Sequence, residues 1–451
     1  MNEELLKILE TLKEDFEMLQ DGSWDLNYSD GSEIQASLDN VDKAININSN
    51  IDTYHFNKGS ALQNLDRNND AIESFDPTEV KLAPENSPLI EVLGSACIDE
   101  YLNWLPTVRL VGDLPSIKVA YTAMHGVGWK TLQAVFKESG FVEPIAALEQ
   151  RDPDPAFPTV AFPNPEEKGA LDIAIALAES QKADVLIAND PDADRLAIAV
   201  PDSTGNWIAL RGDQIGALLG WWIIERANLA GSKISGTFAN SIVSSMLLEP
   251  IAKSAELDYE STLTGFKWVS RVNNLVFGYE EALGYCLDPA NVSDKDGISA
   301  AAVFMELMAH LQSVESTVWQ VLDELANAYG LHVTDQVSIR VTSSEHVAST
   351  MLKIRTNPPK QLGELQVIGI DDLVTGFGKL PATDAVIIHL AGNNQVEKAR
   401  VIIRPSGTEP KIKCYLEVVV RGEDLEIARD TADNELRSLA SDAGPLLSGG
   451  N

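Results

Sequence analysis

The first twenty residues of the chain carry apolar side chains at a helical spacing. Leucines and one phenylalanine alternate with charged residues: Leu5, Leu6, Leu9, Leu12, Phe16 and Leu19. Such a period places the apolar side chains on one face of a helix. Residues 1–20 are therefore predicted to form an amphipathic helix.

A short pattern recurs in the polar stretch that follows. Residues 37–42 (SLDNVD) are echoed 34 residues later by residues 71–76 (AIESFD). This period resembles that of the tetratricopeptide repeat, a helix–turn–helix unit. The second copy breaks at Pro77, where a helix does not easily continue. Residues 1–76 are predicted to be a small all-helical segment, either repeat-like or made of loosely ordered polar helices.

Strands and helices alternate from residue 107 onward, after a linker and a helix within residues 77–106. The elements predicted between residues 107 and 213 are strands over 117–122 and 185–188, helices over 130–139 and 171–180, and a hairpin of strands over 196–200 and 207–210. Five prolines between residues 152 and 165 predict a stiff, extended connector. The alternation indicates an α/β layer, in which functional residues follow the carboxyl ends of strands.

Residues 214–330 continue this alternation, whereas residues 331–445 differ in kind. Helices are predicted in the first region over residues 214–226, 241–254 and 298–311, and strands in the second over 336–341, 385–390, 400–403 and 411–420. The second pattern is typical of a separate α+β domain with an antiparallel sheet. The predicted fold class is α/β: two mixed α/β domains and a C-terminal α+β domain, preceded by the helical segment.

Charge narrows the classes of partner. The 451 residues include 34 lysines and arginines against 68 aspartates and glutamates, a formal net charge of −34. So negative a chain repels phosphate backbones and anionic lipids, which argues against nucleic-acid and membrane partners. An anionic ligand would need a local concentration of positive charge.

Cysteines and apolar runs exclude further classes. The three cysteines, Cys97, Cys286 and Cys414, lie far apart in the sequence, which argues against a disulfide scaffold or a cysteine-rich zinc module. The longest apolar run, residues 215–224, is too short to cross a bilayer. The acidic, amphipathic N-terminus does not resemble a signal peptide. These features predict a soluble cytoplasmic protein.

An acidic motif follows the strand predicted over residues 185–188. In residues 189–195 (NDPDADR), Asp190, Asp192 and Asp194 alternate with other residues, a spacing that lets three carboxylates converge on one hard cation. A calcium EF-hand is excluded because its sixth position here holds an arginine rather than glycine. Three carboxylates leave octahedral Mg²⁺ short of ligands, and a phosphate oxygen with water could complete it. The alternative is a plain acidic turn.

A second motif, residues 404–410 (RPSGTEP), joins two predicted strands. The guanidinium of Arg404, the hydroxyls of Ser406 and Thr408 and the amides around Gly407 can form a phosphate cradle. A plain β-turn accounts for the Pro-Ser-Gly core of this motif. It does not account for the arginine and threonine beside it.

Three weaker signals remain. Glu280 and Glu281 lie between glycines and suit either hydrogen bonding to sugar hydroxyls or a solvated loop. Lys267, within TGFKW, is typical of a surface charge as much as of a site. Among six histidines, only His125 lies in a strand-to-helix turn, where a structural hydrogen bond explains it equally well.

Together these motifs resemble the α-D-phosphohexomutase family of phosphoglucomutases and phosphomannomutases, and within it the branch that contains phosphopentomutases. The motifs that carry the resemblance are TAMHGVG (122–128), PDPAFPTVAFPNPEE (153–167), NDPDADR (189–195), TGFKW (264–268), GYEEALGY (278–285), DKDG (294–297) and RPSGTEPKIK (404–413). The resemblance covers roughly residues 85–445.

The resemblance implies a four-domain fold around a cleft and a reaction that moves a phosphoryl group between two positions of a sugar. A bisphosphorylated sugar is the intermediate and activator, and Mg²⁺ is the cofactor. Residues 107–213 would be domain two with the metal loop, 214–330 domain three with the sugar loop, and 331–445 domain four with the phosphate loop. Domain one of the family supplies a phosphoserine.

The resemblance also implies roles for single residues, carried over by motif. Asp190, Asp192 and Asp194 would bind Mg²⁺, and Arg195 would lie beside the transferring phosphoryl group. Lys267 would reach the cleft as an acid or base, and His125 is the one histidine placed to assist.

The substrate contacts follow in the same way. Glu280 and Glu281 would bind sugar hydroxyls; the next position, a serine in hexose-specific relatives, is Ala282 here. The side chains and amides of four residues would hold the non-reacting phosphate: Arg404, Ser406, Gly407 and Thr408.

One departure separates this chain from the family pattern. The family's nucleophile lies in a Thr-Ala-Ser-His-Asn-Pro-like stretch of domain one, and the 451 residues contain no such stretch. The repeat-like segment stands where domain one is expected. Two hypotheses result: a phosphosugar mutase whose phosphoserine domain is missing, or a non-catalytic pseudo-mutase that binds a phosphorylated sugar, or a protein partner through its N-terminal repeats.

Overall fold

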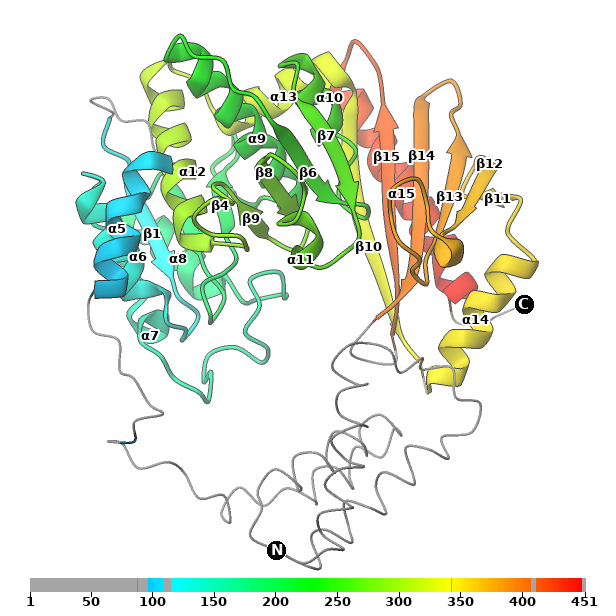
Figure 1. The fold of residues 1–451 in the computed structure, drawn as a ribbon, viewed down its shortest axis with the longest axis horizontal. Coiled ribbons are helices and arrows are strands. Elements are labelled where there is room, and N and C mark those ends of the chain that lie inside the picture. Colours follow the sequence, from blue (N-terminus) through cyan, green and yellow to red (C-terminus); the bar gives the residue numbers. More distant parts are fainter. Residues whose placement is uncertain (1–86, 88–95, 109–114, 342, 407–410, 448–451) are drawn as a thin grey trace, which may run out of the picture. The chain divides into compact units, whose positions relative to one another are not determined.

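The computed structural model describes residue 87 and residues 96–108, 115–341, 343–406 and 411–447, which are coloured in Figure 1. The helical, repeat-like segment predicted over residues 1–76 lies outside these residues, as do most of the linker before residue 96 and residues 407–410 of the predicted phosphate loop. From residue 96 onward, the described chain belongs to one compact unit, Ser95–Asn451.

The first α/β layer contains a five-stranded sheet in the order β2-β1-β3-β4-β5. Its strands are β1 (Val119–Thr122), β2 (Ile145–Ala146), β3 (Val185–Ala188), β4 (Ala197–Pro201) and β5 (Trp207–Ala209). Its helices are α5 (Ala96–Val108), α6 (Gly128–Glu138), α7 (Leu148–Arg151) and α8 (Asp172–Gln181). Strand β1 pairs in parallel with β2 and β3, and β4 and β5 form the predicted antiparallel hairpin.

The second layer contains a four-stranded sheet in the order β7-β6-β8-β9. Its strands are β6 (Thr237–Ser241), β7 (Asp258–Thr262), β8 (Leu275–Glu280) and β9 (Gly284–Cys286). Its helices are α9 (Gly212–Leu229), α10 (Leu248–Ser254), α11 (Phe266–Val269), α12 (Gly297–Ser313) and α13 (Val318–Tyr329). One apolar core, which includes Ile187 from the first sheet and Phe277 from the second, runs through both layers.

The helix predicted over residues 241–254 is wrong in its first half. Ser241 ends strand β6, and helix α10 begins only at Leu248. Pro250 explains the late start, because a proline is tolerated in the first turn of a helix but not in its interior. The residues between them, 241–246, form a turn instead, here called the serine turn.

The C-terminal domain has a six-stranded sheet in the order β10-β15-β14-β13-β12-β11, and every pair in it is antiparallel. Its strands are β10 (Leu331–Arg340), β11 (Gln361–Leu362), β12 (Leu365–Asp372), β13 (Val386–Ala391), β14 (Val396–Pro405) and β15 (Lys411–Val420), with helices α14 (Ser344–Thr356) and α15 (Leu425–Leu447) and a short 3₁₀ helix (Leu373–Thr375). Side chains of both helices, among them Met351 and Leu436, join the sheet in a second apolar core. The predicted α/β class with a C-terminal α+β domain is thus confirmed for the described residues.

Among the described residues, no single helix is long and apolar enough to cross a membrane. Helices α12 and α13 pass that test only as a pair, and a bend of 91° separates them.

Helix α9 packs unusually closely on the second sheet. A Cβ atom on Gly216 would lie 2.8 Å from the ring of Tyr279, a side chain that is fully buried and cannot move aside. One turn earlier, a Cβ on Gly212 would lie 1.9 Å from the carbonyl oxygen of Glu281. The two glycines therefore let α9 lie directly against the strand end that carries Glu280 and Glu281.

We predict that Gly216→Ala lowers the free energy of unfolding by about 1–3 kcal/mol, because the added methyl group overpacks the contact with Tyr279. Urea unfolding measures the change. The control is Gly422→Ala, where the nearest atom to the added Cβ is 3.8 Å away, and it should stay within about 0.5 kcal/mol of the parent. Equal effects at the two positions would contradict the close packing.

Candidate active site

The acidic loop, residues 189–195, leaves the carboxyl end of β3, a fully buried strand inside the first sheet. Asp190, Asp192 and Asp194 each offer one carboxylate oxygen, and the three oxygens lie within 4.8 Å of one another. Asp190 is buried, Asp194 half-buried and Asp192 exposed. The structure therefore brings together the three carboxylates predicted from the sequence.

The three carboxylates repel one another. Burial, with the charges of Asp192 and Asp194, raises the pKa of Asp190 to about 6, although the backbone N–H of Arg195 donates to Asp190 and favours its ionised form. Oxygen donors that repel each other in this way are stabilised by a small divalent cation. Their chemistry therefore fits Mg²⁺, which prefers carboxylate and water ligands.

Two basic side chains border the acidic loop. Arg195 Nε lies 3.5 Å from Asp190 Oδ2 and is buried without a hydrogen-bond partner among the described residues. Lys295 Nζ lies 2.8 Å from Asp194 Oδ2. Burial lowers the pKa of Lys295, but Asp194 and Asp294 outweigh burial and raise it above its ordinary value. Lys295 is thus a fixed positive charge beside the carboxylates.

Strands β8 and β9 form the glutamate hairpin, residues 278–286, in direct contact with the acidic loop. The backbone N–H of Leu196 donates to the carbonyl of Leu283 at 3.0 Å, and Arg195 and Gly284 form an isolated β-bridge. Helix α12 begins equally close, since a Cβ on Gly297 would lie 2.1 Å from the Arg195 carbonyl oxygen. Backbone contacts therefore set the distance between loop and hairpin.

The paired glutamates of the hairpin have different surroundings. Glu280 Oε1 accepts a hydrogen bond from the backbone N–H of Gly265, 2.6 Å away in the TGFKW segment. Glu281 Oε2 accepts from the hydroxyls of Ser241 and Ser244, both at 2.9 Å. Burial raises the pKa of both carboxyls. Glu281 is thus hydrogen-bonded to the serine turn, whereas Glu280 is influenced by the basic residues Arg195 and Lys295.

The arginine loop, residues 404–411, connects β14 to β15. Arg404 lies opposite Lys413 across these strands, and the loop is closed by the Ser406 N–H donating to the Lys411 carbonyl at 2.8 Å. Burial and the charge of Arg404 lower the pKa of Lys413. Gly407 and Thr408, also predicted to bind phosphate, lie outside the described residues.

The three segments are also linked by their charges. Three positive charges act on the carboxyl group of Glu280: Lys295, Arg195 and Arg404. The acidic loop and the glutamate hairpin touch through backbone contacts, and Arg404, more than two hundred residues after the acidic loop, acts on the same hairpin through its charge. Glu166, directly after the proline-rich connector, lines one cavity with Glu281, and burial raises its pKa.

The other two predicted catalytic residues are placed differently. Lys267 is exposed, with Nζ 5.7 Å from the ring centroid of Trp268. His125 is buried, and its Nε2 lies 2.7 Å from the hydroxyl of Thr159 in the connector. The backbone N–H of the same residue donates to the Gln150 carbonyl at 2.9 Å. His125 therefore holds the connector against the turn after β1.

Sequence reasoning missed three residues of this region. Lys295 lies in the DKDG motif, Glu166 in the PNPEE sequence at the end of the proline-rich motif, and Lys413 in the KIK sequence after RPSGTEP. No role was predicted for any of them. Their proximity to Asp194, Arg195 and Arg404 was not predictable from spacing. A useful signal was available: each is a charge inside a short motif flanked by glycine, proline or β-branched residues.

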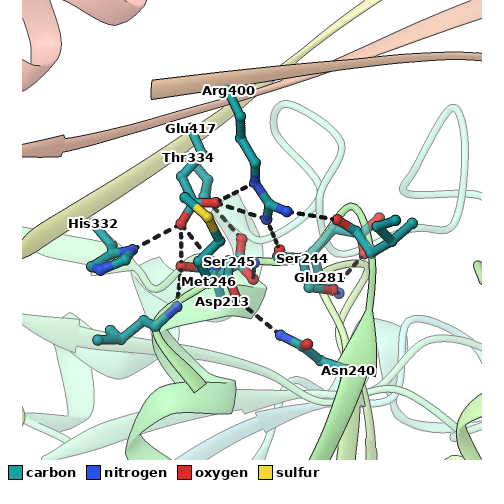
Figure 2. A network of polar contacts seen from close by, with 12 residues as sticks. Asp213, Asn240, Ser244, Ser245, Met246, Glu281, His332, Thr334, Arg400 and Glu417 are labelled. Atoms are coloured by element: carbon teal, nitrogen blue, oxygen red, sulfur yellow. Dashed lines mark hydrogen bonds and ion pairs between the residues drawn. The ribbon is translucent and has the colours of Figure 1, made fainter. Parts of the chain in front are cut away.

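A cavity of ≈ 500 Å³ lies behind Glu281. Its polar lining includes Glu166, Arg211, Asp213, Glu281, Thr334 and Tyr415. Asp213 is the most enclosed of these and accepts from the Ser245 N–H at 2.7 Å and the Thr334 hydroxyl at 2.9 Å (Figure 2). It also accepts from the Tyr279 hydroxyl at 3.0 Å. A buried carboxylate therefore joins α9, β8 and β10 beneath the site.

Three models of one family match successive parts of the chain. They describe alpha/beta/alpha domain II of phosphoglucomutase/phosphomannomutase over residues 99–205, alpha/beta/alpha domain III over 211–329 and the C-terminal domain over 393–434. The chain belongs to the phosphoglucomutase/phosphomannomutase family. The acidic loop lies in its domain II, the glutamate hairpin in its domain III and the arginine loop in its C-terminal domain.

The curated relatives are named as phosphosugar mutases or as a sugar bisphosphate synthase. The chain is 44% identical over 334 residues to "Probable phosphomannomutase" of Haemophilus influenzae, covering 74% of this chain and 66% of that protein. It is 36% identical over 361 residues to human phosphopentomutase, covering 74% and 59%, and 34% identical over 356 residues to human glucose 1,6-bisphosphate synthase, covering 73% and 57%. The chain thus spans 57–66% of the length of these relatives.

Solved structures share the fold. A crystal structure from Thermus thermophilus aligns with a TM-score of 0.57 at 20% identity, covering 84% of this chain and 71% of that one. A phosphoglucomutase/phosphomannomutase family protein from Burkholderia thailandensis aligns with a TM-score of 0.52 at 18% identity, covering 78% and 65%.

The titration of Asp213 gives a pH-dependent prediction. Burial, helped by the charges of Glu281 and Glu417, raises the pKa of Asp213 to about 6, above the ~3.9 of an unfolded chain. A carboxyl whose folded pKa is raised contributes stability below its unfolded pKa and loses it as the pH rises through the folded value.

We therefore expect Asp213→Asn, which cannot ionise, to gain stability relative to the parent by about 2 kcal/mol between pH 4.5 and pH 8. Urea unfolding of both proteins at the two pH values measures this difference. A difference that stays constant with pH would show that Asp213 titrates normally.

Proposed function

We propose that this chain binds a phosphorylated sugar and Mg²⁺ as part of a phosphosugar mutase. The single observation that carries the proposal is the carboxylate cluster of Asp190, Asp192 and Asp194, whose oxygens lie within 4.8 Å of one another, with Arg195 and Lys295 beside them. In a chain of net charge −34, these two cations, together with the charge of Arg404 on Glu280, provide the positive charge that an anionic ligand needs once a metal ion neutralises the carboxylates.

Each residue of the site has a binding role that follows from its position. Arg404 forms charge-assisted hydrogen bonds with the phosphate that does not react, together with the hydroxyl of Ser406 and residues 407 and 408. Glu280 accepts hydrogen bonds from sugar hydroxyls, and its Gly265 contact orients the carboxylate. Arg195 and Lys295 stabilise negative charge on the phosphoryl group at the other end of the sugar.

Mg²⁺ would be held by Asp190, Asp192 and Asp194, and would supply a Lewis acid for a phosphoryl oxygen. Lys267 and His125 are weaker candidates for proton transfer. Lys267 is exposed, and the ring of His125 is already hydrogen-bonded to Thr159. In the proposed mechanism His125 acts by holding the connector that precedes Glu166.

We predict weak Mg²⁺ binding, at millimolar concentrations, because three protein oxygens leave half of an octahedron to water. Asp192→Asn should abolish it in a calorimetric titration, and because Asp192 is exposed the variant should fold normally. Asp258→Asn, an exposed aspartate at the start of β7, is the matched control and should bind like the parent. Unchanged binding by Asp192→Asn would remove the metal site.

Turnover is a separate question from binding. A mutase transfers an enzyme-bound phosphoryl group to its substrate and recovers it from the other hydroxyl, so the protein must offer an acceptor atom. The sequence contains no Thr-Ala-Ser-His-Asn-Pro-like stretch to supply one. This observation favours, as the second candidate, a pseudo-mutase that binds phosphosugars without converting them.

The deciding experiment measures binding and turnover on the same protein. We expect glucose 6-phosphate to bind and Arg404→Ala to weaken it about tenfold to hundredfold, the loss of a charge-assisted hydrogen bond. Arg437→Ala, whose guanidinium bonds to Asp433 and Asn434 within α15, is the control. Equal affinities of Arg404→Ala and the parent would reduce the arginine loop to a structural turn.

In the same experiment we expect the 451-residue chain alone to show negligible mutase activity with glucose 1-phosphate, mannose 1-phosphate or ribose 1-phosphate, even with the bisphosphate present. A coupled assay measures turnover, and mass spectrometry searches for a phosphoserine. Robust turnover, or a phosphoserine between residues 23 and 116, would reveal another nucleophile and overturn the pseudo-mutase hypothesis.

A further inference from the structure

The serine turn, residues 241–246, touches both halves of the proposed site. It begins at the last residue of strand β6, and its serines are almost completely enclosed: Ser241, Ser244 and Ser245 expose 1%, 1% and 2% of their surface. Figure 2 shows it between the side chain of Glu281 on one side and those of Arg400 and Glu417 on the other. None of these contacts is explained by the roles proposed above.

On the hairpin side, Ser244 holds Glu281 at two points. The Ser244 hydroxyl accepts from the Glu281 backbone N–H at 3.0 Å and lies 2.9 Å from the carboxylate oxygen Oε2. Ser241 adds a second hydroxyl to the same carboxylate oxygen, at 2.9 Å. Since Glu281 directly follows Glu280, these bonds fix the end of the strand that presents Glu280 to the sugar.

On the other side, the backbone of the same turn is held by the C-terminal domain. The Arg400 guanidinium donates to the carbonyl oxygens of Ile242, at 3.1 Å, and of Ser244. Its Nε donates to Glu417 Oε2 at 2.8 Å, and Glu417 Oε1 accepts from the Ser245 hydroxyl at 2.7 Å. Arg400 lies on β14 and Glu417 on β15, the two strands that the arginine loop connects.

Apolar packing makes the contact rigid. Ile242 and Val243, at the tip of the turn, join an apolar cluster with Ile387, Ile402 and Tyr415 from the face of the C-terminal sheet opposite helices α14 and α15. Interiors packed in this way deform little. Arg400 and Arg404 lie four residues apart on β14, about 13 Å along a strand. A short series of stiff elements thus runs from Arg404 through Arg400 and Ser244 to Glu280.

We propose that Ser244 is a positioning residue that sets the distance between the hydroxyl-binding Glu280 and the phosphate-binding Arg404, and thereby selects phosphosugars of matching length. The inference rests on the proposed function, because it assumes that these two residues bind the two ends of one ligand. It assigns Ser244 no contact with the ligand. Its effect is to let Glu280 and Arg404, each of which binds weakly alone, bind the same molecule.

The test compares a ligand that would contact both Glu280 and Arg404 with a ligand that would contact Arg404 alone. Glucose 6-phosphate and inorganic phosphate are titrated by calorimetry into the full chain, Ser244→Ala and the matched control Ser349→Ala. The Ser349 hydroxyl is exposed on α14 and bonds to the His346 carbonyl of its own helix.

We expect Ser244→Ala to lower the affinity for glucose 6-phosphate about threefold to tenfold, because Ser244 acts on the ligand only through Glu280, and to leave inorganic phosphate within about twofold. Ser349→Ala should change neither affinity. A merely structural role would weaken both ligands together, and that result, or no change in either, would overturn the inference.

Arg400→Lys is the second variant, informative even if Ser244→Ala does not fold. A lysine retains the charge opposite Glu417 but cannot fork to two carbonyl groups, so the same selective loss is expected. Where both fold, the double variant should lose no more than one single variant, because both interrupt one series of contacts. Additive losses would overturn the inference. A parent chain that binds neither ligand would instead refute the proposed function, and the inference with it.

Discussion

A buried ion pair of the C-terminal domain, Arg400 with Glu417, also bonds to the serine turn of the second α/β layer, and the geometry of the site depends on these contacts. Burial alone would raise the pKa of Glu417, yet Arg400, His332 and Ser245 lower it to about 2. A buried charge is tolerated only where each of its lone pairs finds a donor. Glu417 meets this requirement only with the serine turn seated against β14 and β15. The arrangement of the domains is therefore specified by polar satisfaction as well as by apolar contact.

So acidic a chain must also hold basic side chains near the place where an anionic ligand would bind. With twice as many acidic as basic residues, most cations are expected to be neutralised by nearby carboxylates. Around Glu280 the backbone contacts between acidic loop and hairpin hold Arg195 and Lys295 in place, and β14 holds Arg404. Arg195 and Lys295 can lie close to each other because each is paired with a carboxylate of the acidic loop, Asp190 and Asp194 respectively.

Much of the fold and part of the site were predictable from local pattern. Strand β15 has the predicted bounds, 411–420, because its apolar run is bordered by turn residues. The carboxylates of Asp190, Asp192 and Asp194 converge because alternate residues of one tight loop cannot separate far. The helix predicted over residues 241–254 was wrong because Thr237–Ser241 is a central strand whose partners, β7 and β8, come later in the sequence.

The sequence by itself determined the family, the α/β class of the described residues and the three loops at strand ends, since each depends on residues close together in the chain. Only the tertiary structure decided which charges meet. In the folded chain Glu280 and Glu281 bond to different partners, and Lys295 pairs with Asp194. His125 is buried, and Ser244 lies between two domains. The physical reason is that polar groups become buried through packing between distant segments, and the partner that satisfies each group is chosen by three-dimensional proximity, which spacing along the chain does not encode.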